Sequence, residues 1–493
     1  MSKLFKNLKK FNNKIALIGL DEKKYSYKEI LKNAEHIDSK IANGSLIVMI
    51  ADNDAAPITG YISFIRSNNV TILLDKSFKI EYIQKIISKY KPNYLFGPPE
   101  YFDKLIKIHA VLSLRNYKLF KTNYKKHKKI NKKNLLLLST SGTTQNPKFV
   151  RLSNSNLDNN TRNIIKYLKI ESDHNTITTM PMGYSYGLSI INTHLSSGSK
   201  VVLNNKTVFD RGFWNLVEKY KITSFGGVPQ LYELLKQLKF EKINLPHLKY
   251  LTQAGGKLEK NFLKYFENIC KEKNIKFIVM YGQTEASPRI SYLGWKKFSS
   301  KFGSIGKVLN ESKFKILDKR GKYIKSAYSV GELIYFGKNV SLGYASGLED
   351  LYKGDINKGK LFTGDLVYRD NDNYLYIVGR KSRISKIFGL RIDLDDIEKQ
   401  LQKKQYEVKC VPDNKYLKIL IINDYDHEKM KQTIQNLYGI NKNFILISKV
   451  KQFANLNSLK NLIKLHLKIL RRFSTTCALI MLPRAIHLTL KHR

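Results

Sequence analysis

A run of hydroxyl-bearing residues with a glycine and a lysine follows four consecutive leucines at positions 135–138. Four apolar residues between polar neighbours are typical of a short buried strand, and in α/β proteins anions bind at the carboxyl ends of such strands. Backbone N–H groups beside a glycine, hydroxyls and an ammonium group are donors that phosphate oxygens accept. The run therefore predicts a phosphate-binding loop formed by Thr140, Ser141, Gly142, Thr143, Thr144 and Lys148.

The spacing in this run differs from that of the Walker A loop, in which GxxxxGK is followed by Ser or Thr. Pro147 stands where that motif needs its second glycine, and Phe149 stands where it needs a hydroxyl. A P-loop NTPase is therefore disfavoured. Taken alone, a Ser/Thr-rich run is equally consistent with a solvated turn that binds no ligand. The segments that follow along the chain favour a ligand site.

A second chemical segment, from Tyr281 to Ala286, also follows an apolar run, at residues 277–280. This order predicts a strand that ends in a turn. The Glu285 carboxylate is a suitable ligand for Mg²⁺, and the Thr284 hydroxyl can donate to a phosphate oxygen.

Three further segments follow in the second half of the chain. The segment from Gly331 to Tyr344 is punctuated by glycines and is typical of β structure, with no evident chemistry of its own. Thr363-Gly364-Asp365 supplies a carboxylate that can accept hydrogen bonds from ribose hydroxyls. Residues 379–398 form a basic turn that leads into an expected helix.

The elements around these segments alternate between strand and helix. Apolar runs at 46–50 and 70–74 predict strands, and residues 82–90 predict a helix. Residues 214–220 and 231–238 predict two more helices. This alternation is typical of an α/β protein.

The five segments, in this order, resemble the motifs of the ANL superfamily of adenylate-forming enzymes: acyl- and aryl-CoA synthetases, nonribosomal peptide synthetase adenylation domains and luciferases. The resemblance implies an α/β fold with a large N-terminal adenylation domain of packed sheets and helices and a small, mobile α+β C-terminal lid. We expect these domains at residues 1–379 and 380–465, followed by a basic tail at 466–493. The matching motifs are the phosphate loop at 140–148, YGxTE at 281–285, GELxxxGxxVxxGY at 331–344, TGD at 363–365 and GRxxxxxKxxGxRI at 379–392.

The resemblance also implies a reaction. A carboxylic acid attacks the α-phosphorus of ATP, pyrophosphate leaves, and the acyl-adenylate then acylates a thiol of CoA or of a separate carrier protein. ATP and Mg²⁺ are the implied cofactors, with CoA as a further one. The implied catalytic residues are Lys460, Thr284 and Glu285, with Glu285 as the metal ligand, and the further nucleotide contacts are Tyr281, Gly282, Asp365 and Arg380.

The chain departs from the superfamily pattern at several positions. Gln145 and Phe149 replace glycines around the Pro-Lys pair, which predicts a bulkier and less permissive loop. Ser382 stands where Asp is common, and Leu459 stands in the place of the glycine before Lys460. An alternative function is therefore a catalytically weakened adenylate-binding protein that acts through a basic surface.

The substrate-binding residues implied by the resemblance are Tyr184, Gly255 and Gly256. Tyr184 occupies the place where amino-acid-activating members carry Asp, so an α-amino acid is disfavoured. We expect an acid that is neutral beyond its carboxylate, and the two glycines leave room for a planar or short acyl group. The stretch from Tyr184 to Leu188 also resembles ligases of surface-polysaccharide biosynthesis, which leaves a sugar amine open as the final acceptor.

Net charge is high, with 87 Lys+Arg against 40 Asp+Glu and a formal charge of +47. Such a charge favours nucleic acid or an anionic membrane as a partner when it is concentrated in one stripe. Here the lysines are scattered along the whole chain, so we expect no nucleic-acid partner. The exception is the C-terminal end, which has no acidic residue after Glu428. Residues 462–470 fit helix and strand equally.

The cysteines and the apolar runs of the sequence indicate the cellular compartment in which the protein is expected. Cys270, Cys410 and Cys477 have neither metal-ligand spacing nor a paired arrangement, which fits a reducing compartment. No run reaches the roughly 18 apolar residues needed to span a bilayer. We therefore expect a cytoplasmic protein without a transmembrane segment.

Overall fold

A computed structural model describes residues 4–102, 108–139, 148–381, 384–387, 390–411, 413 and 416–450. The chain divides into two compact units, with the division after residue 382. Gly379 and Arg380, where the sequence placed the domain boundary, are the last residues of strand β21 in the first unit. Each unit is described by itself below.

The first unit contains a nine-stranded sheet in the order β16-β15-β14-β13-β12-β10-β11-β1-β2. The strands from β14 to β1 run parallel, and β15, β16 and β2 pair antiparallel at the two edges. Its strands are β1 Ile15–Ile18, β2 Lys24–Ser26, β10 Asn175–Ile177, β11 Lys200–Val202, β12 Ser224–Gly227, β13 Tyr250–Gln253, β14 Lys276–Gly282, β15 Arg289–Leu293 and β16 Lys307–Val308.

A second, eight-stranded sheet has the order β19-β9-β8-β4-β3-β5-β7-β6. Its central strand β3 is an unbroken apolar run because it is covered on both faces. Ile47 and Met49 pack in one core cluster, and Val48 and Ile50 pack in another. The strands are β3 Leu46–Ala51, β4 Val70–Asp75, β5 Tyr94–Gly97, β6 His109–Leu114, β7 Tyr117–Lys121, β8 Leu136–Ser139, β9 Phe149–Leu152 and β19 Gly343–Ala345.

A third sheet of the first unit has four antiparallel strands in the order β17-β18-β20-β21. The strands are β17 Lys313–Leu317, β18 Gly331–Phe336, β20 Lys360–Arg369 and β21 Leu375–Arg380.

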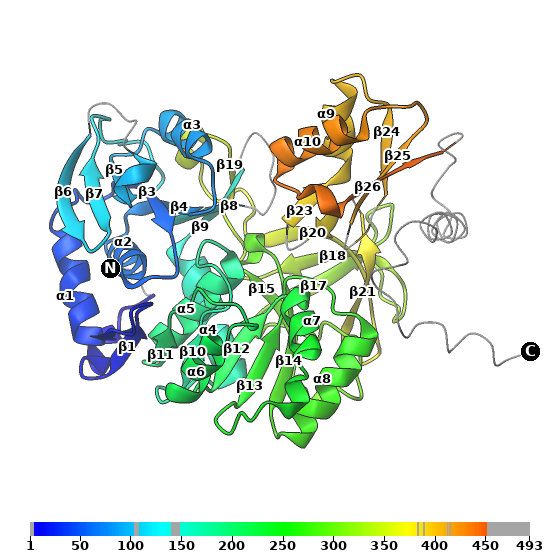
Figure 1. Ribbon diagram of the computed structural model, residues 1–493, viewed down its shortest axis with the longest axis horizontal. Coiled ribbons are helices and arrows are strands. Elements are labelled where there is room, and N and C mark those ends of the chain that lie inside the picture. The colour runs from blue at the N-terminus through cyan, green and yellow to red at the C-terminus, as the bar shows by residue number, and fades with distance from the viewer. Residues whose placement is uncertain are drawn as a thin grey trace, which may run out of the picture. The chain divides into compact units, whose positions relative to one another are not determined.

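Eight α-helices are described in the first unit, and several begin with local caps. Ser26 and Glu29 form a capping box at the start of α1, and Ser153 and Asn156 form one at α4. Figure 1 shows α6, α7 and α8 alongside the nine-stranded sheet. The helices are α1 Tyr27–Asp38, α2 Ala55–Arg66, α3 Ile80–Tyr90, α4 Asn154–Leu168, α5 Ser185–Ser196, α6 Arg211–Lys219, α7 Pro229–Gln237 and α8 Lys260–Glu272. The 3₁₀ turns are η1 Leu8–Phe11, η2 Pro99–Tyr101, η3 Phe240–Lys242, η4 Thr284–Ala286, η5 Trp295–Lys297 and η6 Leu348–Tyr352.

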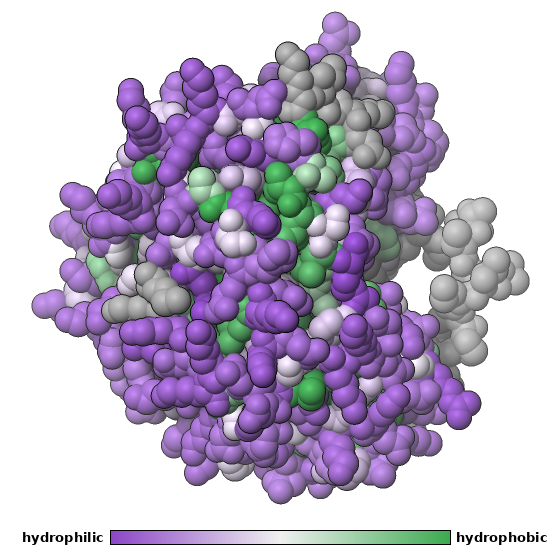
Figure 2. All heavy atoms as spheres, turned by 90° about the vertical axis from the view of Figure 1, so that its left-hand side faces the viewer, coloured by the Kyte–Doolittle hydropathy of each residue, from purple (hydrophilic) through white to green (hydrophobic). Residues whose placement is uncertain are grey.

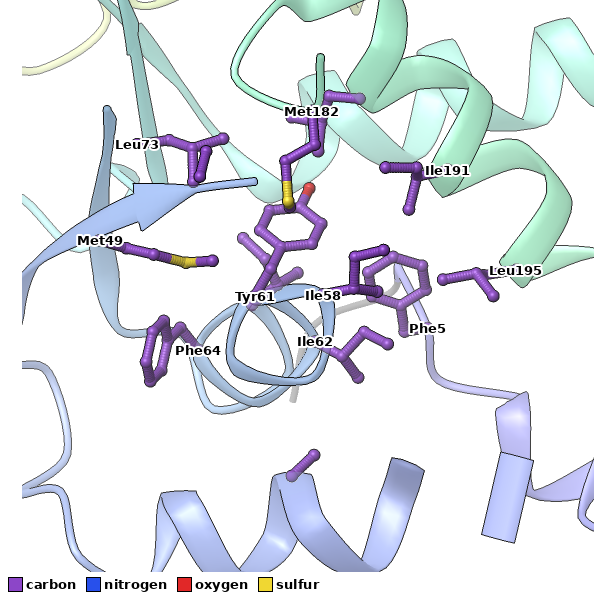
Figure 3. Packing of buried hydrophobic residues seen from close by; sticks show 14 of the residues in the cluster. Phe5, Met49, Ile58, Tyr61, Ile62, Phe64, Leu73, Met182, Ile191 and Leu195 are labelled. Atoms are coloured by element: carbon purple, nitrogen blue, oxygen red, sulfur yellow. The ribbon is translucent and has the colours of Figure 1, made fainter. Parts of the chain in front are cut away.

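Helix α2 is buried along its whole length, and all of its residues from Ala55 to Arg66 are shielded from solvent. Figure 3 shows it enclosed by Met49 and Leu73 of the eight-stranded sheet on one side and by Ile191 and Leu195 of α5 on another. A helix that is apolar all round is stable only inside a core. Helix α2 therefore joins the eight-stranded sheet to the helices that pack on the nine-stranded one.

The second unit contains a two-stranded hairpin and a three-stranded sheet in the order β24-β25-β26. Its core joins Ile397 and Leu401 of α9 and Met430 and Ile434 of α10 in one hydrophobic cluster with that sheet. The elements are β22 Ile384–Ile387, β23 Leu390–Asp393, α9 Leu394–Gln402, β24 Val408–Val411, β25 Leu417–Ile421, α10 His427–Tyr438, η7 Lys442–Phe444 and β26 Ile445–Lys449. The expected class, α/β with a large and a small domain, is confirmed.

Hydrophilic side chains cover most of the face shown in Figure 2. This is consistent with lysines spread along the chain. None of the helices in the described ranges is both long and apolar enough to cross a membrane.

Candidate functional site

The turn after β14 follows a strand, as the sequence predicted. Tyr281 and Gly282 end β14, and η4 begins two residues later. Gly282 pairs with Arg289 of the antiparallel neighbour β15. A Cβ on Gly282 would lie 1.7 Å from the carbonyl oxygen of Pro288, so no larger residue fits there. This close approach fixes the position of η4 at the end of the sheet.

The side chains of η4 are held by hydroxyl groups from other elements. Thr284 Oγ1 lies 3.1 Å from Ser185 Oγ at the start of α5. Glu285 is 3% exposed, and its Oε1 accepts a 2.6 Å hydrogen bond from the hydroxyl of Tyr344 in β19. A carboxylate beside hydroxyl groups offers the hard oxygen donors that Mg²⁺ prefers. The donor chemistry at Glu285 therefore fits a magnesium ion.

Asp365 of β20 is a second buried carboxylate, 2% exposed. It accepts a hydrogen bond from the hydroxyl of Tyr281 and pairs with Arg380, whose Nε lies 2.7 Å from Oδ1. Burial and the neighbouring carboxylate raise the pKa of Tyr281 well above its usual value, so the phenol keeps its proton and donates. Three residues that the sequence singled out separately are thus one connected polar cluster.

The residues proposed for acid binding lie on neighbouring segments. Tyr184 immediately precedes α5, and Gly255 and Gly256 follow β13. A Cβ on Gly255, which has φ +83°, would lie 3.0 Å from the Tyr184 hydroxyl oxygen. Burial raises the pKa of that hydroxyl. A side chain at residue 255 would therefore be strained and would crowd Tyr184.

The predicted phosphate loop is described only at its ends. Lys148 is exposed and immediately precedes β9. Ser139, the last residue of β8, pairs with Phe149, so the two ends of the segment lie together. Thr140, Ser141, Gly142, Thr143 and Thr144 lie outside the described residues, as do Gln145, Lys460 and the tail at 466–493.

Phe149 corrects one expectation from the sequence. It was expected to add bulk to the phosphate loop, but it is the fully buried first residue of β9. Its ring packs edge-on against Tyr90 of α3 with the centroids 5.7 Å apart. The bulk of Phe149 therefore fills the core of the eight-stranded sheet.

Three residues of the site were not identified from the sequence. Ser185 and Tyr344 contact Thr284 and Glu285, and both lie in segments that the resemblance covered without giving them a role. Arg289 follows the YGxTE segment closely, but a single arginine carries no signal in a chain with 87 basic residues. Its burial became evident only from the structure.

A family model described as "AMP-binding enzyme" matches residues 4–345. Among curated proteins, oxalate–CoA ligase of Arabidopsis thaliana is 28% identical over 290 residues, covering 57% of this chain and 55% of that protein. A 2-succinylbenzoate–CoA ligase of Bacillus cereus is 30% identical over 271 residues, covering 55% of this chain and 54% of that protein. The matched region thus spans about half of the length of these relatives.

A similar fold is found in solved structures, over a larger part of this chain than the sequence matches cover. The o-succinylbenzoate CoA synthetase of Bacillus subtilis, bound to a product analogue, superposes with a TM-score of 0.73 at 19% identity, covering 93% of this chain and 98% of that one. This likeness shows a shared fold.

Proposed function

Because this chain belongs to the family of AMP-binding enzymes, we propose that it activates a carboxylic acid with ATP. The acid attacks the α-phosphorus, pyrophosphate leaves, and the acyl group then passes from AMP to a thiol. A free carboxylate is a poor acyl donor because its charge is delocalised and its oxygen is a poor leaving group. Conversion to an acyl-adenylate removes both obstacles.

The observation that carries this proposal is the contact of Tyr281 and Arg380 with the buried carboxylate of Asp365. A carboxylate whose orientation is fixed on two sides is suited to accept hydrogen bonds from the two hydroxyls of a ribose. The cluster lies beside η4 because Tyr281 ends the strand that leads into it. We therefore place the ribose at Asp365 and the α-phosphate at Thr284.

Charge builds up on the phosphate oxygens as the acid attacks, so donors fixed around them stabilise the transition state. We assign this role to Thr284, which Ser185 positions, and to Lys460. The loop residues Thr140 to Thr144 and Lys148 are proposed to hold the β- and γ-phosphates. Glu285 would hold Mg²⁺, which when bound neutralises phosphate charge.

We propose CoA as the acceptor because the two curated relatives are named as CoA ligases. A carrier protein and a sugar amine remain as alternative acceptors for the assay. Tyr184, Gly255 and Gly256 are proposed to bind the acid. Cys270 and Cys410 are buried, and neither forms a disulfide within the described residues, which fits a reducing compartment, so we propose that the reaction takes place in the cytoplasm.

The test is ATP–pyrophosphate exchange with the full chain across a panel of carboxylic acids. Exchange with one class of acid, followed by acid-dependent formation of a CoA thioester, supports the enzyme. Nucleotide binding without exchange on the whole panel contradicts it and favours the alternative, a weakened adenylate-binding protein.

A further inference from the structure

Arg289 is held rigidly at the edge of the proposed active site. It is the first residue of β15 and lies opposite Gly282 of the YGxTE turn. Its backbone carbonyl accepts hydrogen bonds from Asn339 Nδ2 at 2.7 Å and from Asn160 Nδ2 at 3.2 Å. Its side chain is therefore directed by a fixed backbone.

The guanidinium of Arg289 has few partners for a buried cation. The residue is 2% exposed, one of its terminal nitrogens lies 3.5 Å from Ser189 Oγ, and the guanidinium also interacts with the hydroxyl of buried Tyr167. The ring of Tyr186 lies 5.0 Å below it. No carboxylate among the described residues forms an ion pair with it, and Nε has no acceptor there. An arginine carries five N–H donors, and burying the cation without a counter-charge is unfavourable.

The side chain of Arg289 lines a cavity of about 20 Å³ between α4, α5 and the nine-stranded sheet. This space holds about one water molecule, which is similar in size to one carboxylate oxygen. Its lining includes Tyr186, Ser189 and Thr252 but no Asp or Glu. His194 also lines it, and burial lowers the pKa of this imidazole to about 4, so it is neutral at pH 7. Arg289 is therefore the charged group of the lining.

Helix α5 connects this cavity to the proposed reaction centre. Ser185 contacts Thr284, and Ser189, one turn further along the same face, contacts Arg289. Four residues of α-helix rise about 6 Å. A molecule whose reacting carboxylate lies beside Thr284 needs only a short chain to reach Arg289.

We propose that the acid substrate is a short dicarboxylic acid whose second carboxylate pairs with Arg289. This inference rests on the proposed adenylating function and specifies its substrate class. One carboxylate is activated near Thr284, and an oxygen of the other takes the water-sized space beside the guanidinium, where a charge-assisted pair forms. It replaces the expectation from the sequence that the acid is neutral beyond its reacting carboxylate.

The first test uses the unaltered full chain and a matched set of acids. Succinate, glutarate and adipate are compared with the monoamide of each, which has the same shape and no second charge, and with 5-aminopentanoate, which has the opposite charge. We expect a diacid to support exchange with a kcat/KM at least tenfold above that of its monoamide, and we expect the amino acid to be rejected. Equal or better use of the monoamides or of 5-aminopentanoate would overturn the proposal.

The second test replaces the charge. Arg289→Met should lower kcat/KM for the preferred diacid by about a hundredfold, as expected when one partner of a buried charge pair is removed. The same variant should leave the monoamide unchanged or improve its use. Arg289→Lys keeps the charge but loses the planar guanidinium, so its kcat/KM for the diacid should lie between those of the unaltered protein and Arg289→Met. An equal loss for diacid and monoamide in Arg289→Met would assign Arg289 a structural role and contradict the proposal.

Direct calorimetric binding of the same diacids separates this inference from the proposed function. Diacid binding that Arg289→Met abolishes, in a protein that shows no exchange with any acid, would support the site and refute the adenylating activity. Exchange with neutral acids alone, together with no diacid binding, would support the activity and refute the site. Absence of both exchange and diacid binding would refute both.

Discussion

Two buried arginines of the first unit, Arg151 and Arg289, form no ion pair with a carboxylate of the described residues, but the protein compensates their charges very differently. Arg151 in β9 is fully buried and donates to the carbonyl oxygens of Lys353 at 2.7 Å, Leu342 at 3.1 Å and Gly354 at 3.1 Å. Among the described residues, Arg289 has a 3.5 Å contact to Ser189 Oγ and an interaction with the Tyr167 hydroxyl, both of them neutral groups. Nε lacks an acceptor within the described chain in both, so the difference lies in the terminal nitrogens.

This difference separates two uses of the same side chain. The carbonyls around Arg151 accept hydrogen bonds from both terminal nitrogens of its guanidinium, and these contacts tie β9 to the segment around residues 342–354. The side chain of Arg289 instead lines a cavity. Arg380 is a third case, in which a carboxylate, Asp365, supplies the counter-charge. The arrangement at Arg151 stabilises the fold, and the one at Arg380 orients a site. The arrangement at Arg289 is the one that needs a ligand.

The largest effect on stability is expected at Arg151. Arg151→Met removes three hydrogen bonds from the guanidinium to backbone carbonyls, and hydrogen bonds to charged groups contribute about 1.5–3 kcal/mol each, so the free energy of unfolding should fall by at least about 3 kcal/mol. Urea denaturation measures this loss. The folded fraction should keep the acid preference of the unaltered protein. A change below about 1 kcal/mol would show that the carbonyls are not compensating the charge.

A smaller effect is expected at Asp365, the carboxylate that pairs with Arg380. Asp365→Asn removes the negative charge that we assign to the ribose hydroxyls, so the Kd for ATP should rise about tenfold, equivalent to about 1.4 kcal/mol. Equilibrium titration with ATP measures it. Asp370→Asn is the matched control, because Asp370 is also a buried carboxylate and pairs with Lys301 at 2.8 Å, away from the proposed ribose site. An equal rise in Kd for both variants would argue against a ribose contact.

His194 tests whether the cavity beside Arg289 is otherwise uncharged. Burial lowers the pKa of this histidine from 6.5 to about 4 in the folded state. The unfolded chain therefore binds a proton that the folded chain does not, and stability falls as pH decreases from 6.5 towards 4. Between pH 7 and pH 5.5, the free energy of unfolding of the unaltered protein should fall by about 1 kcal/mol more than that of His194→Asn. At pH 8 the imidazole is neutral in both states, so this pH-dependent difference should vanish. Parallel urea midpoints across the whole range would contradict a neutral buried imidazole.

The smallest effect on stability is expected at Arg289. Because its guanidinium is poorly compensated, Arg289→Met should change the free energy of unfolding by less than about 1 kcal/mol, or raise it. Side-by-side urea titration with Arg151→Met gives the comparison directly. A loss as large as that of Arg151→Met would remove the distinction between the two arginines.

The sequence predicted the local elements well. The apolar runs before the two chemical turns are β8 and β14, and the runs at 46–50 and 70–74 lie within β3 and β4. The helix expected at 82–90 lies within α3. These predictions succeed because strands and helices that pack in a core have apolar residues at a regular spacing that can be seen in the sequence. The segment at 281–286 follows a strand as predicted, whereas residues 140–147 of the predicted phosphate loop lie outside the described residues.

The contacts between distant segments could not be predicted. Tyr281 and Asp365 are 84 residues apart and meet only because separate sheets bring their ends together. Phe149 was expected in the phosphate loop because it replaces a glycine of the superfamily motif, whereas its packing against Tyr90 shows that it belongs to the core. A buried arginine without a counter-charge is defined by what surrounds it, and no local pattern encodes those surroundings.

Helix α2 has a consequence for how this unit assembles. Since every residue from Ala55 to Arg66 is covered, the helix has no face that remains favourable in water while its neighbours are unfolded. Its backbone amides should exchange with solvent hydrogen only when the surrounding core opens, at the slowest rate in the unit. The first strands of the eight-stranded sheet and helix α5, more than a hundred residues apart, should therefore gain protection together as one cooperative folding unit.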